Sequence, residues 1–573
     1  MGGGLLGRAM ALGVVGCMAL WTGGCTGSVG GGAPTSAGAG QPGGSGATAS
    51  NGGGAGGSQS SDCQTAPLSV SMSPLQRLSR NEYINTTNYL LGDTRSVGAA
   101  LPIDDQNDLA AGARSLIVTS TWLTDAMQAS ADLAHAAVQN LATLLPCPAS
   151  AGDACAQQFI ETFGKRAFRR PLLPTETTRL MAIYAMGQAN ANFAHGIELV
   201  IQAMLLSPNF LYKIELGVPG SATGGQLKLT PYEVASRLSY MFWGTMPDSV
   251  LFAAADAGKL GTGADVGAQA SRMVSSPQAR ETLIYLHERW LGLDQIAAAT
   301  KDATAYPNFG PDMIAAMTTE AHDFLDSVVW PQGSGLQALL TSTTTSVNSM
   351  LAGLYGVTVP AGSTAFTQVQ LNPAQRSGVL TLTGTIAVHT FADQSEPVHR
   401  GKFVRESLLC QTLPDPPASV MAVPPDPKPG IPIRDRFAEH SSGAACQPCH
   451  QLMDPIGFGF EHYDGLGVWR DMDQGMPVDA TGNIVGSTDT NGPFNGIPDL
   501  ARKLLQSNQV KDCVVSTFVG LTRGAELAGD ACTIKHLRRS YDAANGDVRA
   551  VLVDLTGLDS FYSRPVLAGE VLP

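Results

Sequence analysis

The stretch "LTPYEVASRLSYMFWG", residues 229–244, contains the full signature of an amphipathic helix. Thr230 is a suitable N-cap, Pro231 fits the first helical position, and Glu233 completes a capping box. Three apolar residues at helical spacing follow: Val234, Leu238 and Met241. Gly244 is suited to ending the helix in a left-handed conformation. This stretch therefore predicts one helix with a single buried face.

Helices of the same kind are predicted in three further segments: "LSRNEYINTTNYLLGD" (78–93), "FIETFGKRAFRRP" (159–171) and "HGIELVIQAMLLSPNFLYKIEL" (195–216). Ser79 and Glu82 form a capping box in the first segment. Pro171 stops the second helix, and Pro208 interrupts or restarts the third. These patterns predict a mainly α, multi-domain helical protein.

Strand signals are few. The run "GVLTLTGTIAV" (378–388) alternates briefly or is apolar throughout, which predicts a strand. The Gly-punctuated "GNIVGSTDTNGPFNG" (482–496) predicts a hairpin or a loop. The expected fold is thus helical with a few short strands and, as argued below, a c-type-cytochrome-like segment.

The N-terminus has the features of a bacterial export signal. Arg8 precedes the apolar run "AMALGVVGCMALW", which is too short and too Gly-interrupted to span a bilayer. We predict a signal peptide over residues 1–24, a lipidated Cys25, and a Gly/Ser-rich tether over residues 25–66. The alternative is ordinary secretory cleavage. The expected location is the cell envelope, as an inner- or outer-membrane lipoprotein that faces the periplasm or the cell surface.

The charge balance argues against a nucleic-acid partner. The chain has 35 basic and 48 acidic residues, a formal charge of −13. Removal of the signal peptide with Arg8 leaves 34 basic residues and a charge of −14. No basic stripe interrupts this acidic composition. The expected partners are a membrane, through the N-terminal lipid, and a redox partner of unknown identity.

Cysteines of an exported protein meet an oxidising environment, so unused thiols are expected to pair. Six cysteines fall outside Cys25, the signal peptide and the Cys-x-x-Cys pair: Cys63, Cys147, Cys155, Cys410, Cys513 and Cys532. Proximity in sequence predicts the bridges Cys147–Cys155 and Cys513–Cys532, which leaves Cys63 with Cys410.

The segment "CQPCH", residues 446–450, matches the attachment pattern of haem c. In that pattern two thiols add to the vinyl groups of haem, and the adjacent imidazole becomes the proximal iron ligand. The expected cofactor is one haem c, bound covalently by Cys446 and Cys449 and ligated by His450. Two other uses stay open: a disulfide between the two cysteines, or a zinc site that adds His462. The pattern without any haem is a further possibility.

The sixth position of such an iron has three candidate ligands. Met472 and Met476 are far enough from His450 in sequence to reach the opposite face of a haem, and His440 approaches from upstream. A methionine or histidine ligand makes an electron carrier, whereas an open position permits oxygen or peroxide chemistry.

Six quoted segments occur in the same order in a known family: "RLSRNEYINTTNYLLGD", "FGKRAFRRPLLPTE", "LTPYEVASRLSYMFWGTMPDSVLFAAADAGKL", "RSGVLTLTGTIAVHTFADQSEPVHRGKFVRESLLCQTLPDPP", "CQPCHQLMDPIGFGFEHYDGLGVWR" and "LARKLLQSNQVKDCVVSTFVGLTRG". Over residues 74–562 the chain resembles a bacterial multi-domain family of unknown function with cytochrome-c-like domains, first noticed in planctomycetes. One departure is Glu396, which separates the Ser-Pro step usual in that family. The resemblance implies an exported, mostly helical protein with no settled reaction.

The resemblance and the helix pattern together predict five modules. Their expected bounds are 67–145, 146–220 and 226–357 for three helical modules, 371–475 for the cytochrome-c-like module, and 485–562 for a C-terminal helical module.

Several residues of the cytochrome-like module have two interpretations. Phe460 and Trp469 either wall a haem or belong to the core, and Arg470 and Arg400 are candidates to pair with its propionates. Glycines and acids of the module are expected to be structural. Gly457 and Gly467 should set turns, and Asp454 before Pro455 should start one.

Other catalytic patterns were sought. The chain has no GxSxG, no HExxH and no P-loop. The acid-rich segment 471–492 has oxygen ligands for calcium, but its spacing does not fit an EF-hand, so we expect a solvated loop. His287, Glu288 and the segment 322–327 are expected to be ordinary polar residues on helix faces.

The sequence therefore predicts an exported, lipid-anchored protein that carries haem c and works in electron transfer. Two alternatives stay open. One is a monohaem oxidase or oxygenase that acts on an unknown substrate. The other is a haem-free envelope protein for binding or scaffolding. Whether the protein is an enzyme is left undecided by its residues.

Overall fold

The computed structural model describes residues 63, 75–92, 101–102, 104, 118–331, 335–413, 425–440, 443, 446–523 and 531–571. The chain divides into two compact units, Met1–Gln59 and Ser60–Pro573. The first unit, which contains the predicted signal peptide, Cys25 and most of the tether, lies outside the described residues. All statements below concern the second unit.

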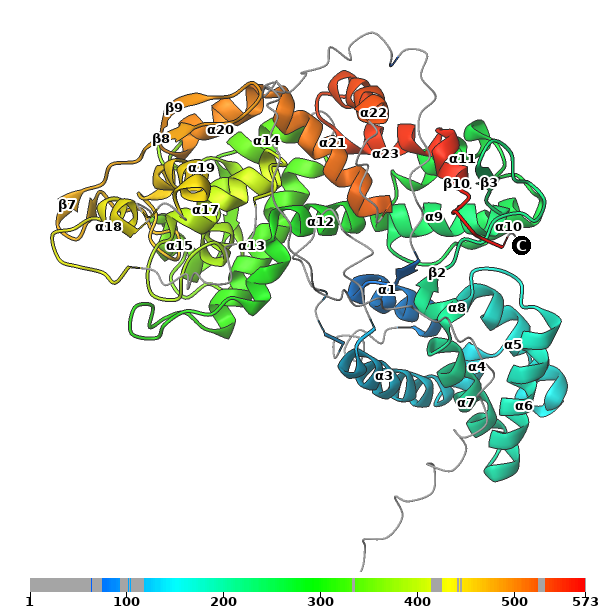
Figure 1. The fold of residues 1–573 in the computed structure, drawn as a ribbon. Helices are drawn as coiled ribbons and strands as arrows, with labels where there is room; N and C mark the ends of the chain where they lie inside the picture. Colours follow the sequence, from blue (N-terminus) through cyan, green and yellow to red (C-terminus); the bar gives the residue numbers. More distant parts are fainter. Residues whose placement is uncertain are drawn as a thin grey trace, which may run out of the picture. The chain divides into compact units, whose positions relative to one another are not determined.

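The N-terminal part of this unit is a group of helices. Its elements are α1 (Arg80–Leu91), α3 (Ser120–Val138), α4 (Leu141–Leu144), α5 (Asp153–Ala167), α6 (Pro174–Asn190), α7 (Phe193–Leu205) and α8 (Pro208–Leu211). The predicted capping box at Ser79 and Glu82 begins α1. The predicted break before Pro208 separates α7 from α8, with Ser207 as N-cap. Helices α5, α6 and α7 pack side by side (Figure 1).

The central part begins with the helix predicted from residues 229–244. Helix α9 (Pro231–Trp243) has the predicted capping box of Thr230 and Glu233, and Gly244 ends it in the left-handed conformation at φ 57°. The following elements are α10 (Ser249–Asp256), α11 (Gly263–Met273), α12 (Pro277–Leu291), η3 (Leu293–Ala298), α13 (Pro311–Val329), α14 (Gly335–Thr341) and α15 (Ser349–Tyr355). Figure 1 colours these elements green.

The predicted strand at residues 378–388 is wrong. The segment folds as a 3-10 helix, η4 (Gly378–Thr381), followed by α16 (Thr383–Val388). Residues 378–387 are all buried, so the run has no solvent face that would produce an alternating pattern. A short apolar run of this kind has the same appearance in a buried strand and a buried helix.

The cytochrome-like module continues with short helices. Its further elements are α17 (Pro397–Phe403), the π-helix η5 (Val404–Leu408), α18 (Ile433–His440), α19 (Gln447–Gly457) and η6 (Phe458–Phe460). Ile433 and Phe437 of α18 pack with Phe458 in a small apolar cluster of their own.

The described strands form two-stranded antiparallel pairs. The pairs are β1 (Gln76–Arg77) with β2 (Tyr212–Lys213), β3 (Gln226–Lys228) with β10 (Ser563–Pro565), β4 (Thr344–Val347) with β5 (Thr367–Gln370), β6 (Met472–Asp473) with β7 (Met476–Pro477), and β8 (Thr481–Ile484) with β9 (Gly492–Asn495). The last pair confirms the hairpin predicted at residues 482–496. The mainly α fold class is confirmed as well.

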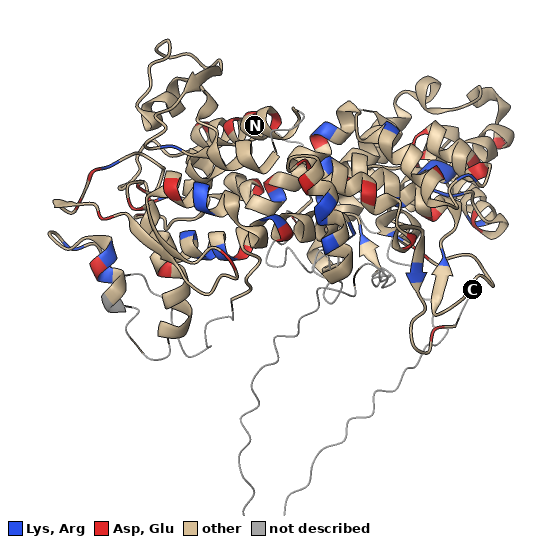
Figure 2. Ribbon diagram, turned by 90° about the horizontal axis from the view of Figure 1, so that it is seen from above, with Lys and Arg blue, Asp and Glu red and all other residues tan. Residues whose placement is uncertain are grey.

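The chain ends in another group of helices. They are α20 (Ile497–Gln506), α21 (Asn508–Arg523), α22 (Ala531–Ala543), α23 (Val548–Thr556) and α24 (Asp559–Tyr562). Their apolar faces join those of α9–α16 and of the cytochrome-like module in one continuous core. Figure 2 shows basic and acidic residues interspersed along the helices. Among the described residues, no helix is both long and apolar enough to cross a membrane.

The six described cysteines outside the Cys-x-x-Cys pair form three disulfides: Cys63–Cys532, Cys147–Cys155 and Cys410–Cys513. The predicted local bridge between Cys147 and Cys155 is confirmed. Two predicted bridges, Cys513–Cys532 and Cys63–Cys410, are wrong because these four cysteines exchange partners.

Packing explains the exchange. Cys513 is buried in α21 and its Sγ lies 3.5 Å from the carbonyl oxygen of Ser407 in η5. Cys410 follows η5 directly and therefore reaches Cys513, although 103 residues separate the two. Proximity along the chain gave the wrong partner because contacts between distant helices decide which thiols meet.

Candidate functional site

The predicted haem-attachment segment forms the start of α19. Cys446 is the N-cap residue, its backbone N–H donates to the carbonyl of Gly443, and the His450 N–H donates to the carbonyl of Cys446. Cys446, Cys449 and His450 are thus spaced i, i+3 and i+4, which brings them to one face of the helix. Both cysteines are half-buried free thiols. Every other described cysteine is in a disulfide.

His450 is oriented by an acid that the sequence analysis had assigned to a turn. Its Nδ1 lies 3.0 Å from Asp454 Oδ1 and 3.1 Å from Oδ2, one helical turn further along α19. This hydrogen bond raises the pKa of His450 above its usual value, and partial burial opposes the rise. A carboxylate only accepts hydrogen bonds, so Nδ1 carries the proton and the neutral ring has its lone pair on Nε2.

The donor set fits a covalently attached haem. Two free thiols three residues apart and an adjacent imidazole with its lone pair on Nε2 are the groups that such a haem requires. An acid that accepts from the second ring nitrogen of a metal-binding histidine is the usual supporting interaction for such a ligand. The i, i+4 spacing of His450 and Asp454 was visible in the sequence and could have identified this acid.

Two glycines let the backbones of α17 and α19 touch. A Cβ atom on Gly457 would lie 1.7 Å from the carbonyl oxygen of Pro397, and one on Gly401 would lie 2.0 Å from that of Met453. The turn predicted at Gly457 is therefore wrong, because this residue is helical and serves close packing. The turn predicted at Asp454 and Pro455 is wrong too, since both lie inside α19. At Gly467, φ is 86°, which confirms the predicted turn.

Arg405, in η5 directly after α17, extends this contact along α19, and sequence reasoning missed it. It lies in the π-helix η5 with a buried side chain, and its Nε donates to the carbonyl oxygen of Leu452 at 2.9 Å. Its two Nη atoms donate to Gln411 and to the carbonyl of Val485. A single guanidinium thus ties α19 to η5 and to the end of β8.

Arg400 and Arg470, the predicted propionate partners, share a buried carboxylate instead. Glu461 accepts from Arg470 at 2.8 Å and lies 3.5 Å from Arg400. Burial raises the pKa of Glu461, and the two guanidinium groups limit that rise. Arg470 also pairs with Asp473 at 2.9 Å.

The two arginines differ in solvent exposure. Arg400 is 1% exposed and donates to the carbonyl oxygens of Phe460, Tyr463 and Asp464, so its role in this structure is to hold the chain after α19. Arg470 is partly exposed. The network they form lies beyond the C-terminal end of α19, whereas Cys446 and Cys449 lie at its N-terminal end.

Phe460 and Trp469 also lie beyond the C-terminal end of α19. Phe460 is 1% exposed and belongs to the main core, which bears out its structural interpretation. Trp469 stacks on His462 with ring centroids 4.2 Å apart and an interplanar angle of 4°. Since α19 rises about 1.5 Å per residue, about 12 Å of helix lies between Cys449 and the end of α19, after which these rings follow.

The structure does not bring Met472 and Met476 to the cysteines. Both lie on the exposed hairpin β6–β7, with 52% and 46% of their surface accessible. Asp473 of this hairpin accepts from the backbone N–H of Ile433 at 2.7 Å, which fixes the hairpin at the N-terminus of α18. The chain leads to Cys446 only after the C-terminus of α18, about 12 Å further on. The side chain of His440 lies outside the described residues.

The structure also decides two alternative uses of the cysteines. The zinc site with His462 is wrong, because His462 follows the opposite end of α19 and its Nδ1 donates to the carbonyl oxygen of Arg470 at 2.8 Å. The disulfide between Cys446 and Cys449 is absent, since both thiols are free.

Metal ligands do not gather elsewhere in the described chain. No group of three or more His, Cys, Asp or Glu side chains within the described ranges has the geometry of a metal site. In the acidic segment 471–492 the carboxylates are used singly: Asp479 accepts from Thr481, and Asp489 accepts from Ser507 and from the backbone of α21. These carboxylates therefore serve local contacts within the segment and with α20 and α21.

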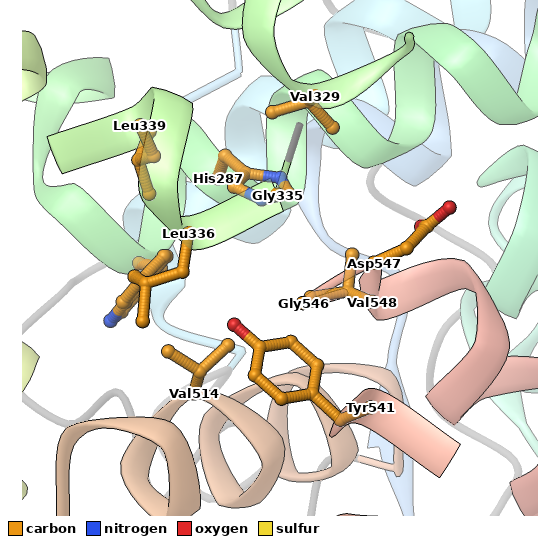
Figure 3. A pocket seen from close by; sticks show the side chains of 11 residues that line it. His287, Val329, Gly335, Leu336, Leu339, Val514, Tyr541, Gly546, Asp547 and Val548 are labelled. Carbon is orange, nitrogen blue, oxygen red and sulfur yellow. The ribbon is translucent and has the colours of Figure 1, made fainter. Parts of the chain in front are cut away.

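His287 lies on a buried face of α12. It lines a cavity of about 20 Å³ between α12, α14, α21 and α23, together with Tyr541 and Val514 (Figure 3). Its Nδ1–H donates to the carbonyl oxygen of Leu283 at 2.7 Å, and burial lowers its pKa to about 4. A cavity of this size has room for about one water molecule, so it is no ligand site.

Three segments of the chain match known family models. Residues 155–215 match PSD5, a protein of unknown function (DUF1595), and residues 229–357 match PSD4, a protein of unknown function (DUF1592). Residues 376–473, which include the Cys-x-x-Cys-His segment, match PSCyt3, a protein of unknown function (DUF1588). No curated protein and no solved structure matches the chain. The three matched segments are thus similar to planctomycete cytochrome-like families of unknown function.

Proposed function

We propose that the mature protein is an exported, lipid-anchored carrier of one haem c and works in electron transfer. The observation that supports this most is the state of Cys446 and Cys449. They are free thiols on the same helix face as His450, in a described chain whose other cysteines are all paired. A cysteine pair kept out of disulfides in an oxidising compartment needs another use, and thioether formation is the use that the adjacent imidazole fits.

The residues of the site have separate tasks in this proposal. Cys446 and Cys449 would hold the haem through thioether bonds to its two vinyl groups, each thiol giving its sulfur to one vinyl carbon and its proton to the other, which would need no oxidant. Asp454 holds the Nδ1–H of His450, which directs the Nε2 lone pair to the metal. Arg405 keeps the backbone of α19 fixed at Leu452. When bound, haem supplies a couple that exchanges one electron at a time.

The monohaem oxidase or oxygenase is the alternative that shares this cofactor. The two differ in the sixth position of the iron, which an electron carrier fills with a protein ligand and an oxygenase leaves open. A reduced protein that binds carbon monoxide readily, with a change in its absorption spectrum, favours the enzyme. A spectrum that carbon monoxide leaves unchanged favours the electron carrier.

The haem proposal is tested on the mature protein produced with export and haem attachment. Haem staining after denaturing electrophoresis should reveal a band, and the intact mass should exceed that of the polypeptide by one haem. Cys446→Ala with Cys449→Ala should abolish both signals. The matched control, Cys147→Ala with Cys155→Ala, removes a local disulfide and should keep them. A colourless, iron-free wild type with correct export would overturn the proposal.

The anchor is tested separately because it rests on other residues. The N-terminal peptide of the mature protein should begin at Cys25 and carry the mass of attached lipid. Cys25→Ser should release the protein from the membrane fraction while haem staining persists. A membrane-bound Cys25→Ser variant would contradict the anchor and leave the haem proposal untouched.

A further inference from the structure

A cavity of about 280 Å³ lies beside the C-terminal end of α19, and the haem proposal does not use it. One wall comes from the segment after α19, with His462, Tyr463 and Trp469. The opposite wall comes from the end of β9 and the start of α20, with Asn495, Asp499 and Arg502. Its volume is close to the lower limit of pockets that hold small molecules, about 300 Å³, and suits a ligand with a single ring.

The cavity is separate from the haem-attachment site. Its lining consists of Pro373, Ala374 and residues from Gly459 onward, after the end of α19, whereas Cys446 precedes the first turn of the helix. The 11 residues of α19 put about 16 Å between the two ends. A ligand in this cavity would therefore bind independently of whether haem is attached.

The aromatic wall is rigid. His462 and Trp469 are stacked in nearly parallel planes, and Tyr463 meets the Trp469 ring edge-on at 5.5 Å. The Nδ1–H of His462 donates to the carbonyl oxygen of Arg470 at 2.8 Å. This bond occupies Nδ1 and fixes the orientation of the His462 ring in the wall of the cavity.

The polar wall carries hydrogen-bond donors and acceptors, and its two charged side chains have opposite signs. Asp499 Oδ1 lies 3.2 Å from Arg502 Nη2, and Asp499 Oδ2 accepts from the backbone N–H of Asn495 at 3.0 Å. Arg502 has 63% of its side chain accessible, so its guanidinium keeps further N–H donors for a ligand. The Asn495 side chain adds an amide that donates and accepts.

We infer that this cavity binds a neutral, polyhydroxylated single ring, the chemistry of a pyranose sugar. An anion or a cation would need a net opposite charge, which the pairing of Asp499 with Arg502 removes. A purely apolar ligand would displace the water bound to Asn495, Asp499 and Arg502 without replacing its hydrogen bonds, which costs binding free energy. A pyranose offers hydroxyl groups to this polar wall and carbon–hydrogen faces to the partly exposed rings of His462 and Trp469, which the buried Tyr463 supports from behind.

The test uses the mature protein and four probes: the methyl glycosides of β-glucose, β-galactose, α-mannose and β-N-acetylglucosamine. Saturation-transfer NMR and calorimetric titration should detect at least one with a Kd below about 10 mM, an affinity that a few hydrogen bonds supply. Arg502→Gln and Asn495→Ala should each weaken that binding about tenfold, since each removes donors to a bound hydroxyl.

Arg539→Gln is the matched control, because Arg539 is exposed on α22 and lies outside the cavity. It should bind the same glycoside as tightly as the wild type. Thermal unfolding of each variant should match the wild type, which excludes misfolding as the cause of weaker binding. The Cys446→Ala, Cys449→Ala variant should also bind the glycoside, so failure of the haem proposal would not affect this result.

Two results would overturn the inference. One is the absence of binding by all four glycosides up to about 10 mM. The other is binding that Arg502→Gln and Asn495→Ala leave as tight as in the wild type, since the glycoside would then occupy a different site.

Discussion

His450 and Asp454 stand one helical turn apart on α19, with His450 Nδ1 3.0 Å from Asp454 Oδ1. An ionised carboxylate that accepts this N–H makes the imidazole a stronger electron donor to a metal on Nε2. Asp454→Asn keeps the shape of the side chain but removes its negative charge, which weakens electron donation from the His450 imidazole to the metal. We expect the reduction potential of the haem protein to rise by about 60 mV, a tenfold change in a one-electron equilibrium. Spectroelectrochemical titration measures it.

Asp512→Asn is the control for this prediction. Asp512 is an exposed carboxylate of α21 that pairs with Arg538, far from α19 in sequence and outside the site described above. The same loss of one negative charge there should leave the potential within about 10 mV of the wild type, since salt screens exposed charges at long range. Equal shifts in the two variants would mean that net charge, rather than the His450 contact, sets the potential.

The contact between α17 and α19 predicts a sharp cost for a single methyl group. A Cβ on Gly457 would lie 1.7 Å from the carbonyl oxygen of Pro397, which is backbone and cannot rotate away. Gly457→Ala should therefore lower the free energy of unfolding by roughly 3 kcal/mol, the upper part of the usual range for overpacking. Urea unfolding followed by circular dichroism measures the change.

Gly267→Ala is the same substitution at a site with free space, and it should raise the free energy of unfolding instead of lowering it. Gly267 lies inside α11, and nothing is within 4 Å of where its Cβ would stand. Alanine is the better helix former, so this variant should gain about 0.5–1 kcal/mol. A Gly457→Ala protein as stable as Gly267→Ala would show that α17 and α19 do not pack as closely as described.

These two glycines also illustrate what the sequence can predict. Local signals were sufficient where a residue acts on its own neighbours: Ser79 and Thr230 begin α1 and α9 as their capping boxes predict, and Gly244 ends α9. Gly457 next to aromatic residues has the appearance of a turn. Its real role depends on Pro397, which is 60 residues away and comes into contact only through the packing of two helices.

The site shows the same limit. The spacing of Cys446, Cys449 and His450 predicted a shared cofactor, and the structure places the three residues at the start of one helix. Trp469 and Arg470 follow closely in sequence and were assigned to the same haem, but a helix of 11 residues carries the chain away from the cysteines before reaching them. The cavity wall at Asn495 and Arg502 was not predicted, because Asn495 ends β9 and Arg502 lies on the polar side of the amphipathic helix α20, and neither residue belongs to a motif that indicates a ligand.

The disulfide pairing is a prediction that peptide mapping tests directly. Digestion without reduction should yield one peptide pair that joins Cys410 to Cys513 and another that joins Cys63 to Cys532. The Cys410–Cys513 bridge closes 103 residues, so its removal by Cys410→Ala with Cys513→Ala should cost about 4–5 kcal/mol in the chain-entropy account.

The bridge between Cys147 and Cys155 is the comparison, because it closes only 8 residues. Its removal should cost about 2.5 kcal/mol by the same account, roughly half as much. Chemical denaturation of both double variants measures the difference. Peptides that join Cys513 to Cys532 would contradict the structure and restore the pairing by sequence proximity.

Glu320 makes the stability of the protein depend on pH. Its carboxylate is fully buried in α13 and accepts from Thr345 at 3.0 Å and from Thr383 at 2.7 Å. Burial raises its pKa from 4.5 to about 7. The folded protein therefore keeps this proton where the unfolded chain has lost it, so the stability that it contributes is complete below pH 4.5 and is lost as the pH rises through 7.

The difference between the two pKa values corresponds to roughly 3 kcal/mol of unfolding free energy between pH 4.5 and pH 8. Glu320→Gln cannot ionise and should gain this amount relative to the wild type across that interval, as measured by denaturant titrations at several pH values. Glu281→Gln is the control: Glu281 is 68% exposed, so its variant should follow the wild type within about 0.5 kcal/mol. Parallel pH curves for wild type and Glu320→Gln would contradict this prediction, because Glu320 would then be ionised in the folded protein at neutral pH without cost. In that case Arg376 would compensate for the burial of the Glu320 carboxylate, since its guanidinium lies 4.7 Å from the ring centre of Tyr355, which is beside this carboxyl.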